Sequence, residues 1–227
     1  MLRKFDNIPV TTTLERTLAK LKIDPDDDED AALVAGLFET AKEIARPKAL
    51  YRECYVEEIS GKNVRIDGRD FESDVVAMTL RDVHRVFAYV CTCGAELEEW
   101  AKGEKDFILR LWLDMIKEMF LRDAIAFLRG HIQSAYQIEK LSSVDPGSGN
   151  ADNWPIAQMS RLFALIGDVR GEIGVGLSGS FMSPVKSTSG LLFPSETEFV
   201  NCALCGRENC SGRRAEFDSE LYARTFI

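Results

Sequence analysis

Apolar residues recur at helical spacing in several parts of the chain. The longest such stretch covers residues 107–141, where the apolar positions are Leu109, Leu113, Ile116, Phe120, Ala124, Phe127 and Leu128. Residues three and four apart share one face of an α-helix, so this stretch predicts a long central helix with one buried face. The same spacing predicts shorter helices at residues 14–21, 31–45, 73–80, 95–101 and 156–166.

Alternation of apolar and polar residues predicts strands in other segments. Residues 49–59 alternate, residues 61–63 (GKN) supply a turn, and residues 64–66 continue as the second strand of a hairpin. Further strands are expected at residues 83–90, 191–193 and 198–202. Because strands and helices come in clusters without regular alternation, we predict an α+β fold with a mainly antiparallel sheet and long helices.

Residues 142–154 are rich in Ser, Gly, Asp, Asn and Pro and predict a loop of about a dozen residues. A loop of this length inside a compact domain suggests a functional role. We further expect the chain to divide into an N-terminal helical segment, residues 1–48, and an α+β domain, residues 49–227.

Composition and charge exclude some classes of function. With 227 residues, of which 45% are hydrophobic, the chain is long enough to bury its own core. The formal net charge of −9 leaves no basic surface for nucleic acid, so we expect no nucleic-acid partner. Residues 1–10 contain no apolar signal region, and charges interrupt residues 107–120, so we expect a cytoplasmic protein that does not enter a membrane.

Three of the six cysteines form a motif near the C-terminus. Cys202, Cys205 and Cys210 have the spacing C-x2-C-x4-C, and thiolates are preferred ligands of zinc and of iron–sulfur clusters. A fourth ligand would come from Cys93, Cys91, Cys54 or water. Two alternatives are reduced thiols without a metal and a disulfide. Arg213 and Arg214 follow the motif and would favour thiolate in either the metal-bound or the free state.

Gly174, Gly176 and Gly179 spell G-x-G-x-x-G, the pattern of dinucleotide-binding loops. That pattern needs a helix directly after it. Pro184 and the serines that surround it oppose such a helix, so the sequence does not support a dinucleotide site. In the same serine-rich segment, Lys186 is a candidate for holding an anion such as a carboxylate.

Several motifs occur in a characteristic order: residues 92–98 (TCGAELE), 145–149 (DPGSG), 153–156 (NWPI), 173–177 (IGVGL) and 187–190 (STSG). In this order they resemble the activation domain of cobalamin-dependent methionine synthase and its free-standing relatives. The resemblance covers roughly residues 40–214. The cysteine motif has no counterpart in the methionine synthase domain itself.

The resemblance implies binding of S-adenosylmethionine and its presentation to the cobalt of an oxidised corrinoid, so that one-electron reduction and methyl transfer restore methylcobalamin. It implies no catalytic residue on this chain. The partner would be a corrinoid-binding protein or methionine synthase, with an electron donor such as flavodoxin or ferredoxin. The candidate cofactor-binding residues are Asp123, Asp145, Pro146, Gly147, Ser148, Lys186, Ser187 and Phe199. We expect residues 145–150 and 182–190 to line one pocket.

Three positions depart from the family pattern. Ser143 stands where the family has an arginine, Ser148 where it has an aromatic residue, and Arg122 near the place of a glutamate. These groups would hold the amino-acid end and the adenine, so weak binding of S-adenosylmethionine is expected. Two alternatives therefore remain: a docking module for a corrinoid protein, with a metal or iron–sulfur site and no S-adenosylmethionine, and a scaffold with structural zinc.

Overall fold

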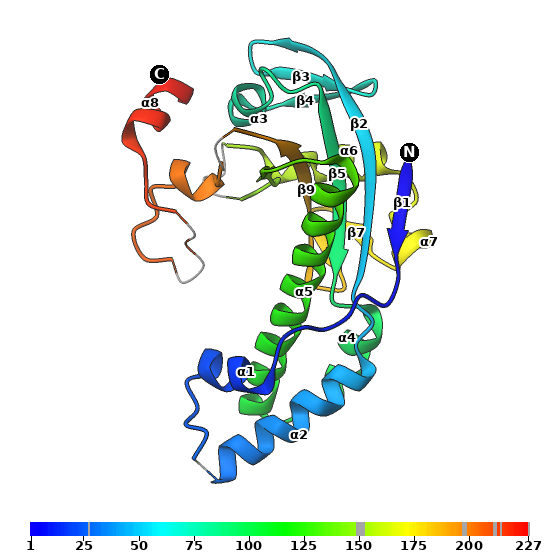
Figure 1. The fold of residues 1–227 in the computed structure, drawn as a ribbon, viewed down its shortest axis with the longest axis vertical. Helices are drawn as coiled ribbons and strands as arrows, with labels where there is room; N and C mark the ends of the chain where they lie inside the picture. The colour runs from blue at the N-terminus through cyan, green and yellow to red at the C-terminus, as the bar shows by residue number, and fades with distance from the viewer. Residues whose placement is uncertain (27, 149–152, 197–198, 211–212, 214, 227) are drawn as a thin grey trace.

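The computed structural model describes residues 1–26, 28–148, 153–196, 199–210, 213 and 215–226 (Figure 1). The helices and strands in chain order are β1 (Leu2–Phe5), α1 (Leu14–Leu21), α2 (Asp28–Ile44), β2 (Lys48–Ser60), β3 (Asn63–Ile66), β4 (Arg69–Glu72), α3 (Asp74–Thr79), β5 (Arg85–Thr92), α4 (Ala95–Ala101), α5 (Phe107–Tyr136), β6 (Leu141–Val144), η1 (Ile156–Gln158), α6 (Met159–Ile166), α7 (Val169–Ile173), β7 (Gly176–Ser178), β8 (Phe181–Ser183), β9 (Ser187–Pro194), η2 (Asn201–Leu204) and α8 (Ser219–Phe226).

One large sheet organises the molecule. Its strands follow the order β4-β3-β2-β5-β9-β6, and β1 pairs with β2 beside β3. Every described pairing in it is antiparallel, as is the separate β7–β8 hairpin. The predicted α+β fold with a mainly antiparallel sheet and long helices is therefore confirmed.

Strand β5 shows how the sheet separates two cores. Alternate residues of a strand point to opposite faces. Val86, Ala88 and Val90 therefore join a core on the face covered by α3, α6 and α7. Phe87, Tyr89 and Cys91 join a second core on the face covered by α2, α4 and α5. A strand buried on both faces needs apolar residues throughout, which explains the continuous apolar run at residues 86–91.

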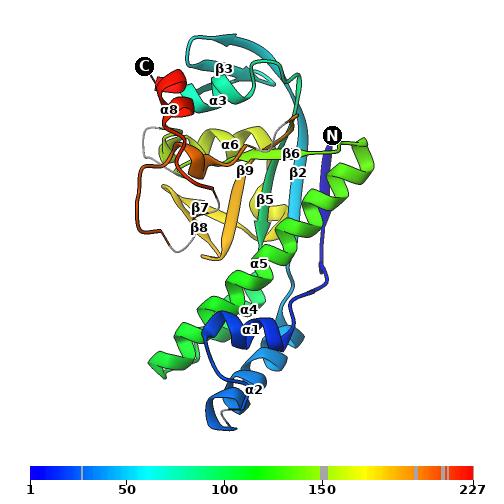
Figure 2. The ribbon, with the colours of Figure 1, turned by 60° about the vertical axis from the view of Figure 1, so that its left-hand side comes forward.

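Helix α5 extends well beyond the sheet, as Figures 1 and 2 show. Its first turn is capped by Asp106, whose carboxylate accepts hydrogen bonds from the backbone N–H groups of Ile108 and Leu109. It ends five residues earlier than predicted, because Gln137 takes a left-handed conformation with φ of 54° that stops the helix. Phe120 lies fully buried on its inner face.

The N-terminal segment packs against the projecting half of α5. Helices α1 and α2 lie beside it in both views, and the Phe38 ring of α2 meets Phe120 edge to face at 5.9 Å between centroids (Figures 1 and 2). Strand β1 joins the large sheet, so residues 1–48 contribute a strand as well as the expected helices. The division at residue 48 stays a prediction.

Two local predictions are corrected by the structure. Residues 142–144, predicted as loop, belong to β6, because their backbone pairs with β9 despite two serines. The strand predicted at residues 198–202 is absent from its described part, where Asn201 begins the 3-10 helix η2. The sequence pattern also missed α8 and the elements β1, β4, α7, β7 and β8, the last five of which are too short to show a period.

Among the described residues, none of the helices combines the length and the apolar composition that a membrane span requires.

Candidate functional site

A pocket of about 540 Å³ opens where the loop after β6, the start of β9 and one face of α5 meet. The loop contributes residues 145–148, and β9 with the segment before it contributes residues 185–189. Helix α5 supplies Glu118, Leu121, Arg122, Ile125 and Arg129. The lining is completed by Tyr89, Met159, Met182, Phe199 and Val200, so it comes from segments far apart in the sequence.

Seven of the eight residues predicted to bind a cofactor line this one pocket: Asp145, Pro146, Gly147, Ser148, Lys186, Ser187 and Phe199. Of the two segments expected to line a common pocket, residues 145–148, Met182 and residues 185–189 do so, whereas Ser183, Pro184 and Gly190 do not. Residues 149–150 lie outside the described part. The binding role of these residues stays a prediction.

Asp123 is the exception. Its two carboxylate oxygens accept hydrogen bonds from the Thr11 backbone N–H at 3.0 Å, the Thr11 hydroxyl at 2.7 Å and the Thr12 N–H at 2.9 Å. Asp123 is not among the residues that line the pocket. These hydrogen bonds join the segment before α1 to helix α5, and the assignment of Asp123 to the cofactor site stays a prediction.

The loop after β6 owes its shape to Gly147. This residue has φ of 75°, in the left-handed region that favours glycine. Its N–H donates to the Trp154 carbonyl at 2.8 Å, and a Cβ atom there would lie 2.9 Å from the Ile156 side chain. The backbone of the loop is therefore held close beneath the pocket, where a larger residue would not fit.

Asp145 and Tyr89 form the floor of the pocket. The Tyr89 hydroxyl, from β5, donates to Asp145 Oδ1 at 2.8 Å. Burial, followed by the charge of Asp145, raises the pKa of Tyr89 well above its ordinary value, so the phenol remains a donor. Gly190 makes room for this arrangement, because a Cβ atom at residue 190 would overlap Asp145 Oδ1.

Among the described residues, no group forms a hydrogen bond with the Ser189 hydroxyl, although Ser189 is only 3% exposed. Buried hydroxyls are normally paired, because an unpaired one forfeits its hydration. Ser189 lines the pocket, so a bound molecule is in a position to supply the missing partner.

Lys186, the candidate for holding an anion, is partly buried and paired with two carboxylates. Its side chain is 18% exposed, and its ammonium lies 2.8 Å from Asp114 Oδ2 and 3.6 Å from Glu118 Oε2. Burial alone would lower the pKa of Lys186, but the two carboxylates outweigh it and raise the pKa. The anion beside Lys186 is thus supplied by helix α5 itself.

Sequence reasoning missed Tyr89 and Glu118 as pocket residues. Glu118, Arg122 and Arg129 share one face of α5 at spacings of four and seven residues, but this spacing alone does not distinguish a pocket wall from a solvent-exposed face. All three positions that depart from the family pattern, Arg122, Ser143 and Ser148, also line the pocket.

The cysteines fall into two groups. Cys54, Cys91 and Cys93 are fully buried, and burial raises the pKa of Cys54 and of Cys93 to about 12. Cys202 lies on η2 and Cys205 directly after it, and both are partly exposed. A fourth metal ligand from Cys93, Cys91, Cys54 or water stays a prediction.

Arg213 ties the cysteine segment together through its backbone. Its guanidinium donates to the carbonyls of Cys202, Cys205, Arg207 and Ala215. Arg214 lies outside the described residues. Within the described part of the chain, no three His, Cys, Asp or Glu side chains gather as metal ligands, so the metal site at Cys202, Cys205 and Cys210 stays a prediction.

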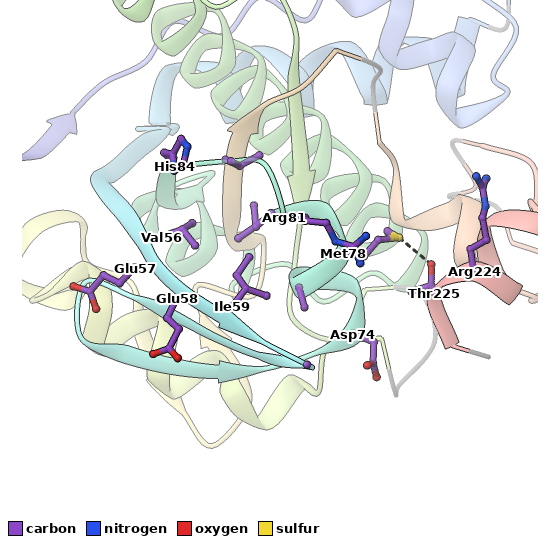
Figure 3. A pocket seen from close by; sticks show the side chains of 14 residues that line it. Val56, Glu57, Glu58, Ile59, Asp74, Met78, Arg81, His84, Arg224 and Thr225 are labelled. Carbon is purple, nitrogen blue, oxygen red and sulfur yellow. Dashed lines mark hydrogen bonds between the residues drawn. The ribbon is translucent and has the colours of Figure 1, made fainter.

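A second cavity, of about 660 Å³, lies between the far end of β2, α3 and α8 (Figure 3). Thr225 of α8 donates to Met78 Sδ of α3 at its edge. Figure 3 shows its charged side chains, among them Glu57, Glu58 and Arg224, pointing in different directions. Because no set of polar groups converges there, we place the candidate site in the smaller pocket.

No protein-family model matches the chain, and no curated protein matches it. The fold is nevertheless of a recognised class, that of methionine synthase reactivation domains. It resembles the crystal structure of the MetH reactivation domain bound to AdoHcy, with a TM-score of 0.60 and 12% sequence identity. The match covers 88% of this chain and 81% of that one, and at this identity it establishes the fold.

Proposed function

We propose that this chain is a stand-alone reactivation component for a corrinoid-dependent methyltransferase, such as methionine synthase. Its pocket would bind S-adenosylmethionine and hold it toward the corrinoid of the partner protein. One observation carries the proposal: the fold is that of a domain whose solved structure holds AdoHcy. In addition, seven residues that the family resemblance implies as ligand-binding line one pocket of this chain.

The pocket has the size and chemistry for an S-adenosyl ligand. Its volume of about 540 Å³ lies within the range of about 300–1,000 Å³ typical of small-molecule sites. Leu121, Ile125 and Phe199 offer apolar surface to an adenine ring. The backbone of residues 146–148 and the Ser189 hydroxyl offer hydrogen bonds to the nucleoside.

S-adenosylmethionine supplies a methyl group on a positively charged sulfur, and an electron donor such as flavodoxin or ferredoxin would reduce the corrinoid cobalt that receives it. The proposed role of this chain is to bind S-adenosylmethionine and to orient it. Asp145, held by Tyr89, places a carboxylate in the pocket, where it attracts a cation. The exposed Phe181 and Val185, which are 81% and 68% exposed, flank the Met182 and Lys186 side of the pocket and offer apolar surface to a partner.

We expect the affinity to be in the micromolar range or weaker. Ser143 and Ser148 present short hydroxyl side chains where the family resemblance places an arginine and an aromatic ring. Loss of an arginine that pairs with a carboxylate costs about 2–5 kcal/mol when the pair is buried.

Isothermal titration of the purified chain with S-adenosylmethionine tests the proposal. Ser189→Ala removes the unpartnered hydroxyl and should weaken binding about fivefold, the loss of one neutral hydrogen bond. Ser178→Ala, on the exposed β7 strand, is the matched control and should leave the affinity unchanged. Absence of binding at millimolar ligand would contradict the proposed function.

A further inference from the structure

Glu118 stands at the centre of a row of charges along the α5 wall of the pocket. Its Oε1 accepts from the Arg122 guanidinium, at 2.7 Å from Nη2 and 3.3 Å from Nε. Its Oε2 lies 3.6 Å from the Lys186 ammonium. Glu118 and Arg122 both line the pocket, and they are separated by one helical turn.

The ion pair between Glu118 and Arg122 can separate without leaving a buried charge unpaired. Lys186 has a closer partner in Asp114, at 2.8 Å, which it keeps when Glu118 turns away. The side chains of Arg122 and Glu118 are 58% and 42% exposed, and exposed pairs one helical turn apart contribute little to stability. A ligand therefore meets little resistance when it separates them.

The other charged groups that line the pocket already have partners within the protein. Arg129 donates to the Leu141 carbonyl at the start of β6, and Asp145 accepts from Tyr89. Glu118 and Arg122 are thus the acid and base that can change partner while the fold stays intact.

We infer that Glu118 and Arg122 form a two-point dock for an α-amino-acid zwitterion, with the ligand carboxylate on the Arg122 guanidinium and the ligand ammonium on Glu118. This rests on the proposed function, because the amino-acid end of S-adenosylmethionine is such a zwitterion. A guanidinium accepts a carboxylate through two parallel hydrogen bonds. Binding replaces the ion pair between Glu118 and Arg122 with two ion pairs to the ligand, so each charged group keeps a partner of opposite sign.

The charge states agree with this role. The hydrogen bond from Arg122 lowers the pKa of Glu118, so the carboxylate is ionised at neutral pH. Arginine remains protonated throughout the physiological range.

Titration with two probes isolates the dock. S-adenosylhomocysteine carries the amino-acid zwitterion, and 5′-methylthioadenosine has the same adenosyl group without it. Arg122→Gln and Glu118→Gln should each weaken S-adenosylhomocysteine binding about tenfold or more, because each removes one charge-assisted contact. Binding of 5′-methylthioadenosine should change less than about twofold.

Glu99→Gln is the matched control, because Glu99 pairs with Lys102 at 2.7 Å on an exposed helix surface outside the pocket. It should leave the affinity for both probes unchanged. If S-adenosylhomocysteine binds equally well to Arg122→Gln, or if both probes weaken together, the dock is contradicted while the proposed function stands. If neither probe binds the unsubstituted chain, the proposed function and the dock are contradicted together.

Discussion

At the scale of single residues, Gly190 shows how tightly the pocket floor is built. A Cβ atom there would overlap Asp145 Oδ1 and lie 2.7 Å from the Val144 carbonyl oxygen. We expect Gly190→Ala to lower the free energy of unfolding by about 1–3 kcal/mol, the usual cost of overpacking. Chemical denaturation measures this cost.

Gly130→Ala is its control. Gly130 lies inside α5, and a Cβ atom there would meet nothing within 4 Å. Alanine should stabilise the helix by about 0.5–1 kcal/mol. A Gly190→Ala protein as stable as the unsubstituted chain would contradict the close approach of Asp145 to β9.

The two groups of cysteines should differ in reactivity. Cys202, Cys205 and Cys210 are partly or fully exposed, whereas Cys54, Cys91 and Cys93 are buried with raised pKa values. We expect three thiols to react with a disulfide reagent in the native protein and three more only after unfolding. Protection of the first three by added zinc would support the predicted metal site, and six equally fast thiols would contradict the structure.

Residue types alone showed part of the site. Gly147 and Pro146 stand out because glycine and proline disfavour a helix, and their loop could be found from the sequence. Glu118 could not, because a charged residue on a helix has the same pattern whether it faces solvent or a pocket. Asp123 does not line the pocket although Arg122 does, since adjacent helical residues point about 100° apart.

At the scale of elements, α5 joins the core to the pocket. Phe120 is fully buried and packs against Phe38 of α2. Phe120→Asp places an unpaired charge between α5, α2 and the sheet, and should cost more than about 3 kcal/mol of unfolding free energy. Thermal unfolding checks this, with Phe107→Asp as control, because Phe107 is 75% exposed in the first turn of α5. An unchanged melting temperature for Phe120→Asp would contradict the packing of the helix.

Lys186 joins the segment before β9 to α5 through ion pairs with Asp114 and Glu118. The pKa of Glu118 is lowered from 4.5, so its contribution is present above pH 4.5 and is lost as pH falls through the lowered value. The pKa of Lys186 is raised from 10.5, so its contribution is present below pH 10.5 and is lost as pH rises through the raised value.

Lys186→Met should therefore lower the melting temperature most between pH 4.5 and pH 10.5. The difference from the unsubstituted chain should shrink at pH 3 and at pH 11. An equal difference at all pH values would show that Lys186 acts through packing and not through its charge.

Long elements were more predictable than short ones. The period of α5 and the alternation of β2 run over enough residues to identify them. Strand β6, with only four residues, forms because β9 offers a partner, which no local pattern shows. The same dependence on a distant neighbour explains why β1 was missed.

At the scale of the whole molecule, the sheet separates two cores, and residues of α5 line the pocket. Figures 1 and 2 show α5 running from the N-terminal helices to the sheet. This arrangement leaves one side of α5 to bind the N-terminal segment through Asp123 and another side to line the pocket. The fold class could be predicted from the sequence, because it depends on the types of elements. The position of the pocket could be predicted only roughly, because the segments that line it are far apart in the sequence and come together only in the folded chain.

The most direct test of the central claim is a crystal structure of the chain grown with S-adenosylhomocysteine. The account predicts the adenosyl group between residues 146–148 and 187–189, with the amino-acid end at Glu118 and Arg122. Ligand bound in the cavity between β2 and α8, or an empty pocket at saturating ligand, would contradict it.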